Sequence, residues 1–332
     1  MQTITVLGAG SWGTALAAHF GRVGHDVRLW ARDQGLVGDM SARRANVVYL
    51  PDVTLPPNVS VTHALDQALR GSPIVVSAIP SHGSRAVLRA AASRIQPGAI
   101  VVSATKGLET ETLLRMSEVI GQELPGHPVV VLSGPSFAVE VARDLPTAVV
   151  AASDNQAAME LVQLEFRGPY FRLYGSDDVV GVEIGGAIKN VIAIAAGVVE
   201  GLGLGHNALA ALITRALAEM TRLACAAGGR RDTLAGLSGL GDLVLTCTGE
   251  LSRNRHVGIE LARGRSLADV LASMKMIAEG VKTTGAALAL GARHGVELPI
   301  ATQMGEVLAG RADVRSALDA LMLRRQRTES EA

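Results

Sequence analysis

The sequence has few aromatic residues, two cysteines, no excess of charge of either sign and no long uninterrupted apolar run. Aromatic side chains make up 3% of the 332 residues, so the core has to be built from aliphatic side chains. Cys225 and Cys247 are too few and too far apart for a disulfide framework or a zinc site, and the histidines show no metal-ligand spacing. We therefore expect neither disulfide bonds nor a bound metal.

Partners of two kinds are excluded by charge and hydropathy. Lysine plus arginine (31) balances aspartate plus glutamate (31), whereas a protein that binds nucleic acid usually carries a basic excess. The longest apolar run, residues 191–199, is shorter than the roughly 20 residues needed to cross a bilayer. The chain opens into a strand-like run rather than a signal peptide, and so few cysteines suit a reducing compartment. We expect a cytoplasmic protein with no nucleic-acid partner and no integral membrane segment.

The first half of the chain alternates short β-branched runs with helical patterns. Several of these runs are apolar throughout, which is typical of strands buried on both faces of a helix-covered parallel sheet. With a length that fits about two domains, this predicts an α/β domain over residues 1–180, with a Rossmann-like doubly wound sheet. The expected strands are residues 3–7, 27–31, 59–62, 74–78, 100–104, 129–133 and 148–151.

The second half is dominated by long segments rich in alanine and leucine. The segment 208–227 shows an apolar stripe at helical spacing, with Asn207 as the expected N-cap and Gly228 as the stop. This predicts an all-α domain over residues 181–332. The expected helices are residues 182–199, 208–227, 267–274, 283–291 and 314–323.

A glycine-rich motif, Gly8-Ala9-Gly10-Ser11-Trp12-Gly13, lies between the first expected strand and an alanine-rich helix. In this context Gly8 allows a tight turn, Gly10 lets a pyrophosphate approach the backbone, and Gly13 lets the helix pack on the strand. The helix N-terminus then attracts the phosphates. The alternative is a glycine-rich turn that binds nothing. The strand context favours a dinucleotide-binding site.

The end of the second expected strand selects the cofactor. An acidic residue at this position binds the ribose of NAD, and an arginine accommodates the 2′-phosphate of NADP. Arg32 suits a 2′-phosphate, because a guanidinium binds phosphate through two hydrogen bonds and stacks on adenine. Asp33 is the counter-candidate for NAD. NADP is favoured, and use of both cofactors stays open.

Three further residues follow the ends of expected strands, where ligands of doubly wound sheets bind. Lys106 follows the strand at 100–104, and Gly134 and Ser136 follow the strand at 129–133. The lysine is therefore expected to face the ligand crevice. The alternatives are an exposed loop lysine and a glycine and serine that only make a turn.

Lys189 stands in an expected helix that is apolar on nearly every side. A buried ammonium is costly, and its pKa tends to fall. A lysine in such a position can act as a general acid or base near neutral pH. The alternative is a lysine that pairs with Glu183 or extends its ammonium to water.

A stretch rich in Gly, Ser, Thr, Asn and Arg, residues 238–255, suits an anion-binding loop. Asp242 is a candidate for orienting a lysine. Arg253 is a candidate phosphate ligand, with Ser252 and Asn254 as neutral donors. The alternative is a solvated surface loop. Cys247 has no base beside it and is read as structural.

Together these stretches resemble the bacterial NAD(P)-dependent glycerol-3-phosphate dehydrogenase family. The resemblance runs over nearly the whole chain, through GAGSWGTALA, KGLE, GPSFA, EIGGAIKNVIAIAAG, SGLGDLVLTCTGELSRNRHVG and AEGVKTT, in that order. It implies reversible conversion of dihydroxyacetone phosphate and sn-glycerol 3-phosphate, which supplies phospholipid synthesis.

The resemblance also implies roles for individual residues, with Lys189 as the proton donor or acceptor. Tyr49 and Ile277 rest on the resemblance alone. The implied substrate contacts are Lys106, Gly134, Ser136, Lys189, Asp242, Ser252, Arg253 and Asn254. The implied cofactor contacts, with the motif glycines Gly8, Gly10 and Gly13, are Ser11, Trp12, Arg32, Tyr49, Lys106, Ala138, Arg253, Ile277 and Glu279.

Two other functions compete with this one. The first is another reductase with the same two-domain plan, of the ketopantoate or hydroxyacyl-CoA type. A hydroxyacyl-CoA enzyme is expected to use a His–Glu pair, where this sequence has Lys189. The second is a non-catalytic dinucleotide sensor, which leaves Lys189 and Arg253 unexplained. The oligomeric state stays open, and a homodimer is possible.

Overall fold

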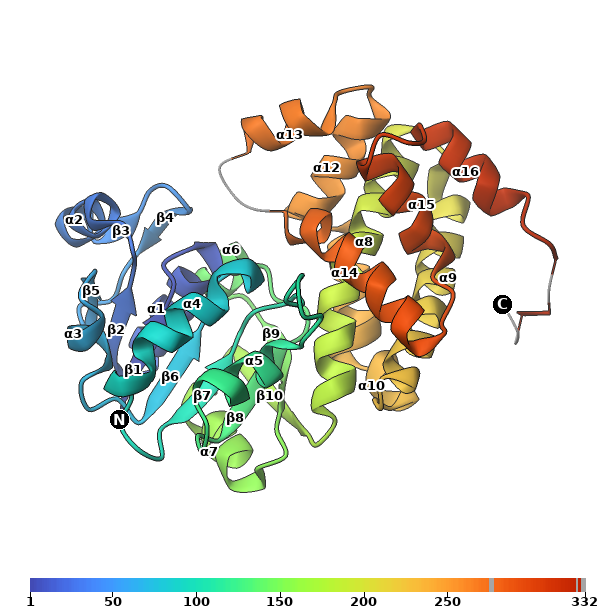
Figure 1. Cartoon of the computed structure of the whole chain (residues 1–332). Helices are drawn as coiled ribbons and strands as arrows, with labels where there is room; N and C mark the ends of the chain where they lie inside the picture. Colours follow the sequence, from blue (N-terminus) through green and yellow to red (C-terminus); the bar gives the residue numbers. More distant parts are fainter. Residues whose placement is uncertain (275–277, 327, 330–332) are drawn as a thin grey trace. The chain divides into compact units, whose positions relative to one another are not determined.

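The computed structural model describes residues 1–274, 278–326 and 328–329, and the chain divides into two compact units (Figure 1). The first unit comprises Met1–Lys106 and Leu114–Val179, and the second comprises Gly107–Leu113 and Val180–Ala332. The short segment Gly107–Leu113 thus belongs with the second unit, and Leu108 packs in the core of that unit. Each core is mainly aliphatic, as the scarcity of aromatic residues requires, and Phe20, Phe166 and Phe171 are buried in the core of the first unit.

The first unit is built on a sheet with strand order β10-β9-β8-β7-β6-β1-β2-β5. All neighbouring strands are parallel except β8 and β9, which are antiparallel. The chain starts in the interior of the sheet, at β1, adds β2 and β5 on one side and then adds β6 to β10 on the other. The strands are β1 (Thr3–Leu7), β2 (Asp26–Trp30), β5 (Val59–Thr62), β6 (Ile74–Ser77), β7 (Ile100–Ser103), β8 (Val129–Ser133), β9 (Thr147–Ala152) and β10 (Phe171–Ser176).

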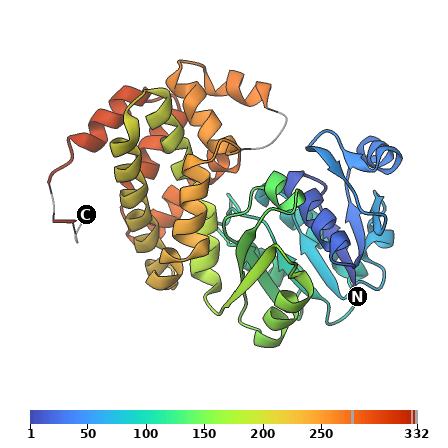
Figure 2. The same ribbon diagram turned by 180° about the vertical axis from the view of Figure 1, so that it is seen from behind.

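Helices cover both faces of this sheet, as Figures 1 and 2 show. One face packs against α1 (Ser11–Arg22), α6 (Ala138–Ala142) and α7 (Gln156–Phe166), and the other against α3 (Leu65–Leu69), α4 (Ser81–Ala91) and α5 (Met116–Glu123). A single turn, η1 (Ala92–Arg94), follows α4. The two buried faces explain why the strands are apolar throughout, and the predicted doubly wound α/β fold is confirmed.

Three elements of the first unit escaped the sequence prediction. Strand β10 lies at the edge of the sheet, where Arg172 and Tyr174 are exposed. These two residues interrupt the apolar run that marks the other strands. Strands β3 (Ala45–Asn46) and β4 (Leu50–Thr54) form a short antiparallel pair after α2 (Gln34–Arg43). Strand β3 has only two residues, too few for a periodic pattern, and β4 contains a proline and an aspartate, which are uncommon in strands.

The second unit is helical, and α8 (Val179–Gly201) is its buried centre. Every residue from Gly181 to Val199 is buried. A Cβ added at Gly197 would lie 1.9 Å from the carbonyl oxygen of Arg255, so α8 and α12 cross at backbone contact. The other helices are α9 (Gly205–Ala226), α10 (Arg231–Ala235), η2 (Leu237–Gly241), α11 (Asp242–Thr248), α12 (Arg253–Ala262), α13 (Leu267–Ser273), α14 (Glu279–His294), α15 (Pro299–Leu308) and α16 (Val314–Met322).

The all-α fold predicted for this part of the chain is confirmed, while two local expectations in it are wrong and some of its helices were missed. Helix α9 begins at Gly205, with Leu204 rather than Asn207 at the N-cap position. Helix α15 was not predicted. The stretch 238–255 is largely helical rather than a loop, because a single π-type turn, η2, leads directly into α11.

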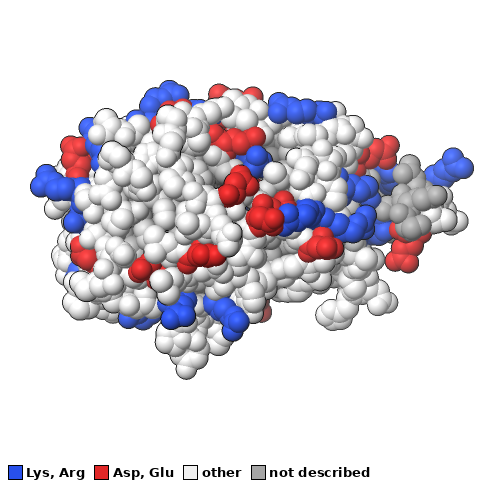
Figure 3. All heavy atoms as spheres, turned by 90° about the horizontal axis from the view of Figure 1, so that it is seen from below, with Lys and Arg blue, Asp and Glu red and all other residues white. Residues whose placement is uncertain are grey.

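Helix α8 is the one helix among the described residues that is long and apolar enough to cross a membrane by length and composition. The uninterrupted apolar run at residues 191–199 is shorter than this helix, because Lys189 and Asn190 precede it directly. Of its most apolar window, 89% is buried inside the protein, as in the core helix of a folded domain. On the face shown in Figure 3, acidic and basic side chains are interspersed, in line with 31 residues of each sign.

Candidate active site

The glycine-rich turn between β1 and α1 has the geometry of a phosphate-binding turn. Gly8 has φ +109°, and a Cβ added at Gly13 would lie 1.8 Å from the carbonyl oxygen of Gly8. A Cβ added at Gly10 would meet nothing within 4 Å. Gly10 is the N-cap of α1 and provides no side-chain cap, and the first turn holds no acidic residue. The turn therefore offers a helix N-terminus and open space to an anion.

The residues expected around this turn differ in their surroundings. Arg32 is exposed directly after β2, whereas the Asp33 carboxylate accepts the N–H of Leu36 and caps α2. The Trp12 indole N–H donates to the carbonyl oxygen of Ala104, 3.1 Å away. Tyr49 is half-buried in the turn between β3 and β4. Ser11 begins α1 and Ala138 begins α6, and both are half-buried.

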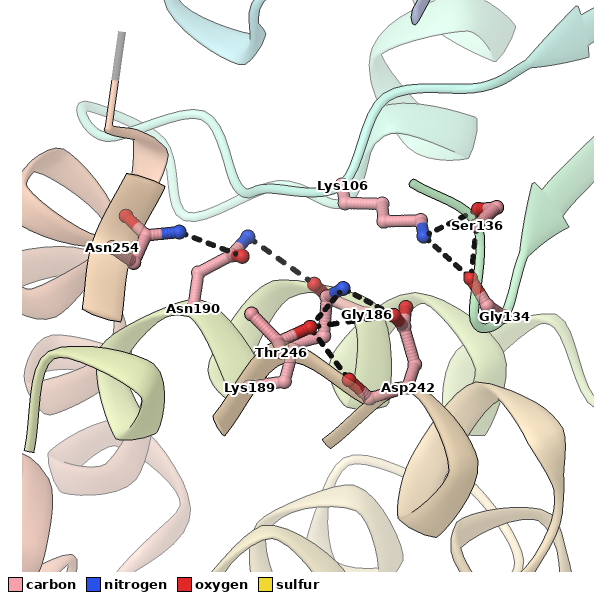
Figure 4. Close-up of polar contacts among 9 residues, drawn as sticks. All are labelled: Lys106, Gly134, Ser136, Gly186, Lys189, Asn190, Asp242, Thr246 and Asn254. Carbon is pink, nitrogen blue, oxygen red and sulfur yellow. Dashed lines mark hydrogen bonds and ion pairs between the residues drawn. The ribbon is translucent and has the colours of Figure 1, made fainter. Parts of the chain in front are cut away.

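Lys106 lies beyond the end of β7, with its ammonium held by neutral oxygens (Figure 4). Its Nζ donates to the carbonyl oxygen of Gly134 at 2.7 Å and to the hydroxyl of Ser136 at 3.2 Å. The Ser136 hydroxyl in turn donates to the same carbonyl at 2.9 Å. Gly134 needs its positive φ of +126° at the end of β8. The structure thus brings together the three residues predicted after β7 and β8.

Lys189 lies within the second unit, buried on α8 with its side chain 7% exposed. Its Nζ forms an ion pair with Asp242, whose side chain is 1% exposed, and donates to the Thr246 hydroxyl at 2.9 Å (Figure 4). The Thr246 hydroxyl donates to the carbonyl oxygen of Asp242 at 2.6 Å. The ammonium therefore does not extend to water, and Asp242 provides its counter-charge, as the predicted orienting role requires.

The predicted anion ligands lie at the start of α12. The Ser252 hydroxyl caps this helix by accepting the N–H of Arg255, at 3.3 Å. Arg253 keeps exposed surface. Partial removal from water lowers the pKa of its guanidinium, and the negative charge of Glu279 opposes that shift. Arg253 is therefore a charged side chain with access to solvent.

Asn254 is more enclosed than predicted. Its Nδ2 donates to the Asn190 side-chain oxygen at 3.0 Å, and its Oδ1 accepts the N–H of Gly280 at 2.9 Å. It thereby links α8, α12 and α14. Ile277 lies outside the described residues.

Sequence reasoning missed two residues that contact this cluster. Thr246 lies one helical turn after Asp242, a spacing that would have revealed it had the stretch been read as a helix. Asn190 follows Lys189 directly, and only the packing of α12 shows its link to Asn254 (Figure 4). Burial raises the pKa of Cys247 to about 12, so its thiol stays protonated and packs as an apolar group.

A phosphate-binding turn on a doubly wound sheet, joined in one chain to a helical unit with a buried lysine–carboxylate pair, defines an oxidoreductase that uses a nicotinamide dinucleotide. Comparison with known proteins agrees. Residues 3–159 match the family model for the N-terminus of NAD-dependent glycerol-3-phosphate dehydrogenase, and residues 178–319 match the model for its C-terminus.

Curated relatives and a solved structure match over the full length. The glycerol-3-phosphate dehydrogenase [NAD(P)+] of Koribacter versatilis is 52% identical and that of Geobacter sulfurreducens is 52% identical, each over 99% of both chains. The glycerol-3-phosphate dehydrogenase of Coxiella burnetii is 40% identical, with a TM-score of 0.94 over 97% of this chain and 99% of that one. The chain belongs to the NAD-dependent glycerol-3-phosphate dehydrogenase family. The resemblance seen in the sequence is confirmed, and the protein is an NAD(P)-dependent enzyme.

Proposed function

We propose that this enzyme interconverts dihydroxyacetone phosphate and sn-glycerol 3-phosphate, with Lys189 as the proton donor and acceptor. The observation that carries the proposal is the buried ion pair of Lys189 with Asp242, completed by the Thr246 hydroxyl. An ammonium so enclosed has a fixed direction, which general acid catalysis requires. When bound, the nicotinamide supplies or accepts the hydride at the central carbon of the substrate.

Within this proposal Lys189, Asp242, Thr246 and Lys106 have separate roles. Lys189 gives a proton to the oxygen that becomes the hydroxyl in reduction and takes it back in oxidation. Asp242 and Thr246 hold Lys189 in place and keep it charged before the transfer. Lys106, held by Gly134 and Ser136 in the first unit, contributes positive charge toward cofactor and substrate.

The glycine-rich turn fits a dinucleotide, because open space adjoins Gly10 at an uncapped helix N-terminus. Ser11, Trp12, Tyr49, Ala138, Arg253 and Glu279 are the further cofactor contacts of this proposal. The exposed Arg32 favours NADP over NAD. The Asp33 carboxylate, which would bind the ribose of NAD, already uses one oxygen to cap α2. We place the enzyme in the cytoplasm, where it supplies glycerol 3-phosphate to phospholipid synthesis.

The cofactor preference is tested by Arg32→Ala. Losing a charge-assisted contact with the 2′-phosphate is expected to cost about 1.5–3 kcal/mol in NADPH binding and to spare NADH. Binding of each dinucleotide is measured by titration calorimetry. Equal weakening of both would mean that Arg32 contacts the adenine rather than the phosphate.

The substrate phosphate is assigned to Arg253, with Ser252 and Asn254 beside it. A site built to bind a charged group rejects an analogue that lacks it. The enzyme is therefore expected to prefer dihydroxyacetone phosphate strongly to dihydroxyacetone in an assay of NADPH oxidation. Arg253→Ala should raise KM for the phosphorylated ketone alone, and Arg253→Lys should recover only part of the loss, because an ammonium lacks the planar fork of donors.

The decisive quantity is the ratio of kcat/KM for the two ketones in each variant. If Arg253→Ala slows both ketones by one factor, the phosphate role is wrong. If the unsubstituted enzyme oxidises no NADPH with dihydroxyacetone phosphate, the proposed reaction is wrong.

A further inference from the structure

Asn46 is a fully buried amide, with 0% of its surface exposed, that contacts the glycine-rich turn. Its Nδ2 donates to the carbonyl oxygen of Ala9 at 2.9 Å and to the Thr14 hydroxyl at 2.8 Å. Its Oδ1 accepts the N–H of Tyr49 at 3.1 Å. A carbonyl can only accept and an N–H can only donate, so these partners allow one orientation of the amide.

The backbone around Asn46 is shaped to direct this side chain. The residue ends β3, and the pairing of β3 with β4 shifts register between Ala45 and Asn46. Such a shift, as at a β-bulge, redirects a side chain out of the regular alternation. One amide thereby joins the hairpin that carries Tyr49 to the first turn of α1.

The bond to Ala9 fixes the direction of the next N–H group. In a planar trans peptide the carbonyl oxygen and the following N–H point to opposite sides. With the Ala9 oxygen turned toward Asn46, the N–H of Gly10 points away from Asn46. A reversed peptide would exchange the two, and its carbonyl oxygen would then repel an anion on that side.

We propose that Asn46 is a positioning residue for the dinucleotide, which holds the Ala9–Gly10 peptide in the orientation that binds the pyrophosphate. Through the N–H of Tyr49 it also fixes the hairpin residue expected to contact the cofactor. The proposal rests on the proposed function, because it assumes that the glycine-rich turn binds the dinucleotide. It assigns to Asn46 no contact with substrate and no part in proton transfer.

The chain offers a matched control at the other end of α1. The Nδ2 of Asn58 donates to the carbonyl oxygens of Gly21 and His25, at 2.8 and 2.7 Å. Asn58 therefore makes the same kind of bond to the same helix, away from the glycine-rich turn. Replacing Asn58 therefore shows how cofactor binding responds when α1 is loosened at a distance from the glycine-rich turn.

The experiment compares Asn46→Ala, Asn46→Asp and Asn58→Ala in the full chain. Dissociation constants for NADPH and NADH are measured by titration calorimetry, stability by thermal unfolding, and KM for dihydroxyacetone phosphate at saturating NADPH. In Asn46→Ala both dissociation constants should rise roughly tenfold and by similar factors, the effect of one lost hydrogen bond. Asn46→Asp should weaken binding further, because a carboxylate cannot donate to Ala9 and repels phosphate.

Two readouts separate positioning from a merely structural role. KM for dihydroxyacetone phosphate should stay within about twofold in the Asn46 variants, and Asn58→Ala should lower the unfolding temperature while its dissociation constants stay unchanged. If Asn46→Ala does not fold, Asn46→Leu, which keeps much of the side-chain volume and introduces no charge, carries the test.

Three results would overturn the inference or its premise. Dissociation constants unchanged in a folded Asn46 variant would remove the positioning role. An equal rise in Asn58→Ala would reduce it to general loosening of α1. Failure of the unsubstituted enzyme to bind either dinucleotide would instead overturn the proposed function.

Discussion

The two units hold their candidate lysines in different ways. In the first unit Lys106 is half-buried in a loop, and its ammonium is satisfied by a backbone carbonyl and a hydroxyl. In the second unit Lys189 is buried in the central helix and faces a carboxylate that is itself buried. A charge that keeps contact with water needs only neutral acceptors, whereas a fully enclosed charge needs an opposite charge. Burial therefore decides whether a lysine needs a carboxylate beside it or only neutral hydrogen-bond acceptors.

The largest expected effect is on turnover, when the enclosed lysine is removed. Lys189→Met keeps much of the volume and removes the proton donor, so kcat should fall by about 10²–10⁴-fold. NADPH binding should be retained, because the glycine-rich turn belongs to the other unit. Steady-state assays and calorimetry on the same preparation measure both. Turnover near that of the unsubstituted enzyme would leave Lys189 as a structural ion pair.

The next effect is on stability. Lys189→Met removes one partner of the buried ion pair with Asp242, which should cost about 3–5 kcal/mol in the free energy of unfolding. Asp242→Leu should also be destabilising, because it removes the carboxylate that pairs with the buried Lys189 ammonium. Urea unfolding of the double variant Lys189→Met/Asp242→Leu should recover most of the loss without recovering activity. Additive losses would show that the pair does not act as a unit.

The units should also respond to acid with opposite signs. Burial lowers the pKa of His19, in the first unit, from 6.5 to about 4. The folded state therefore disfavours protonation, and the first unit loses up to about 3 kcal/mol as pH falls from 6.5 to 4. Burial raises the pKa of Glu219, in the second unit, from 4.5 to about 6, although the N–H groups of Ile300 and Ala301 oppose that shift. The second unit therefore gains about 2 kcal/mol as pH falls from 6 to 4.5.

Hydrogen exchange resolved by peptide separates the two units across this pH range. Trp12 and Trp30, the two tryptophans of the chain, both lie in the first unit, so tryptophan fluorescence reports that unit alone. His19→Gln should flatten the response of the first unit only, and Glu219→Gln that of the second. Parallel weakening of both units toward acid would contradict the assignment.

The two units also differ in how far the sequence predicts them. The turn at Gly8 and Gly13 follows from local backbone geometry, and the enclosed Lys189 follows from helical periodicity, so both were predicted. The helix that carries Asp242 was read as a loop, because Gly239 and Gly241 directly before it suit a turn. Gly239 serves packing instead: a Cβ added there would lie 2.1 Å from the carbonyl oxygen of Leu234. Asn46 gave no signal, since it ends a two-residue strand and the groups to which its amide donates, on Ala9 and Thr14, are distant in sequence.

The smallest expected effect is the change in the free energy of unfolding when Lys106 is replaced. It tests the comparison of the two lysines directly. Lys106→Met removes an ammonium that donates to the Gly134 carbonyl and the Ser136 hydroxyl, and this hydroxyl still donates to the Gly134 carbonyl after the change. Because Lys106 is only half-buried, the free energy of unfolding should fall by less than about 1 kcal/mol. Activity should nevertheless decline, because the positive charge near the end of β7 is lost. A loss of stability as large as that of Lys189→Met, under the same urea conditions, would mean that Lys106 also balances a buried charge. The contrast between a loop lysine held by neutral oxygens and a core lysine held by a carboxylate would then be wrong.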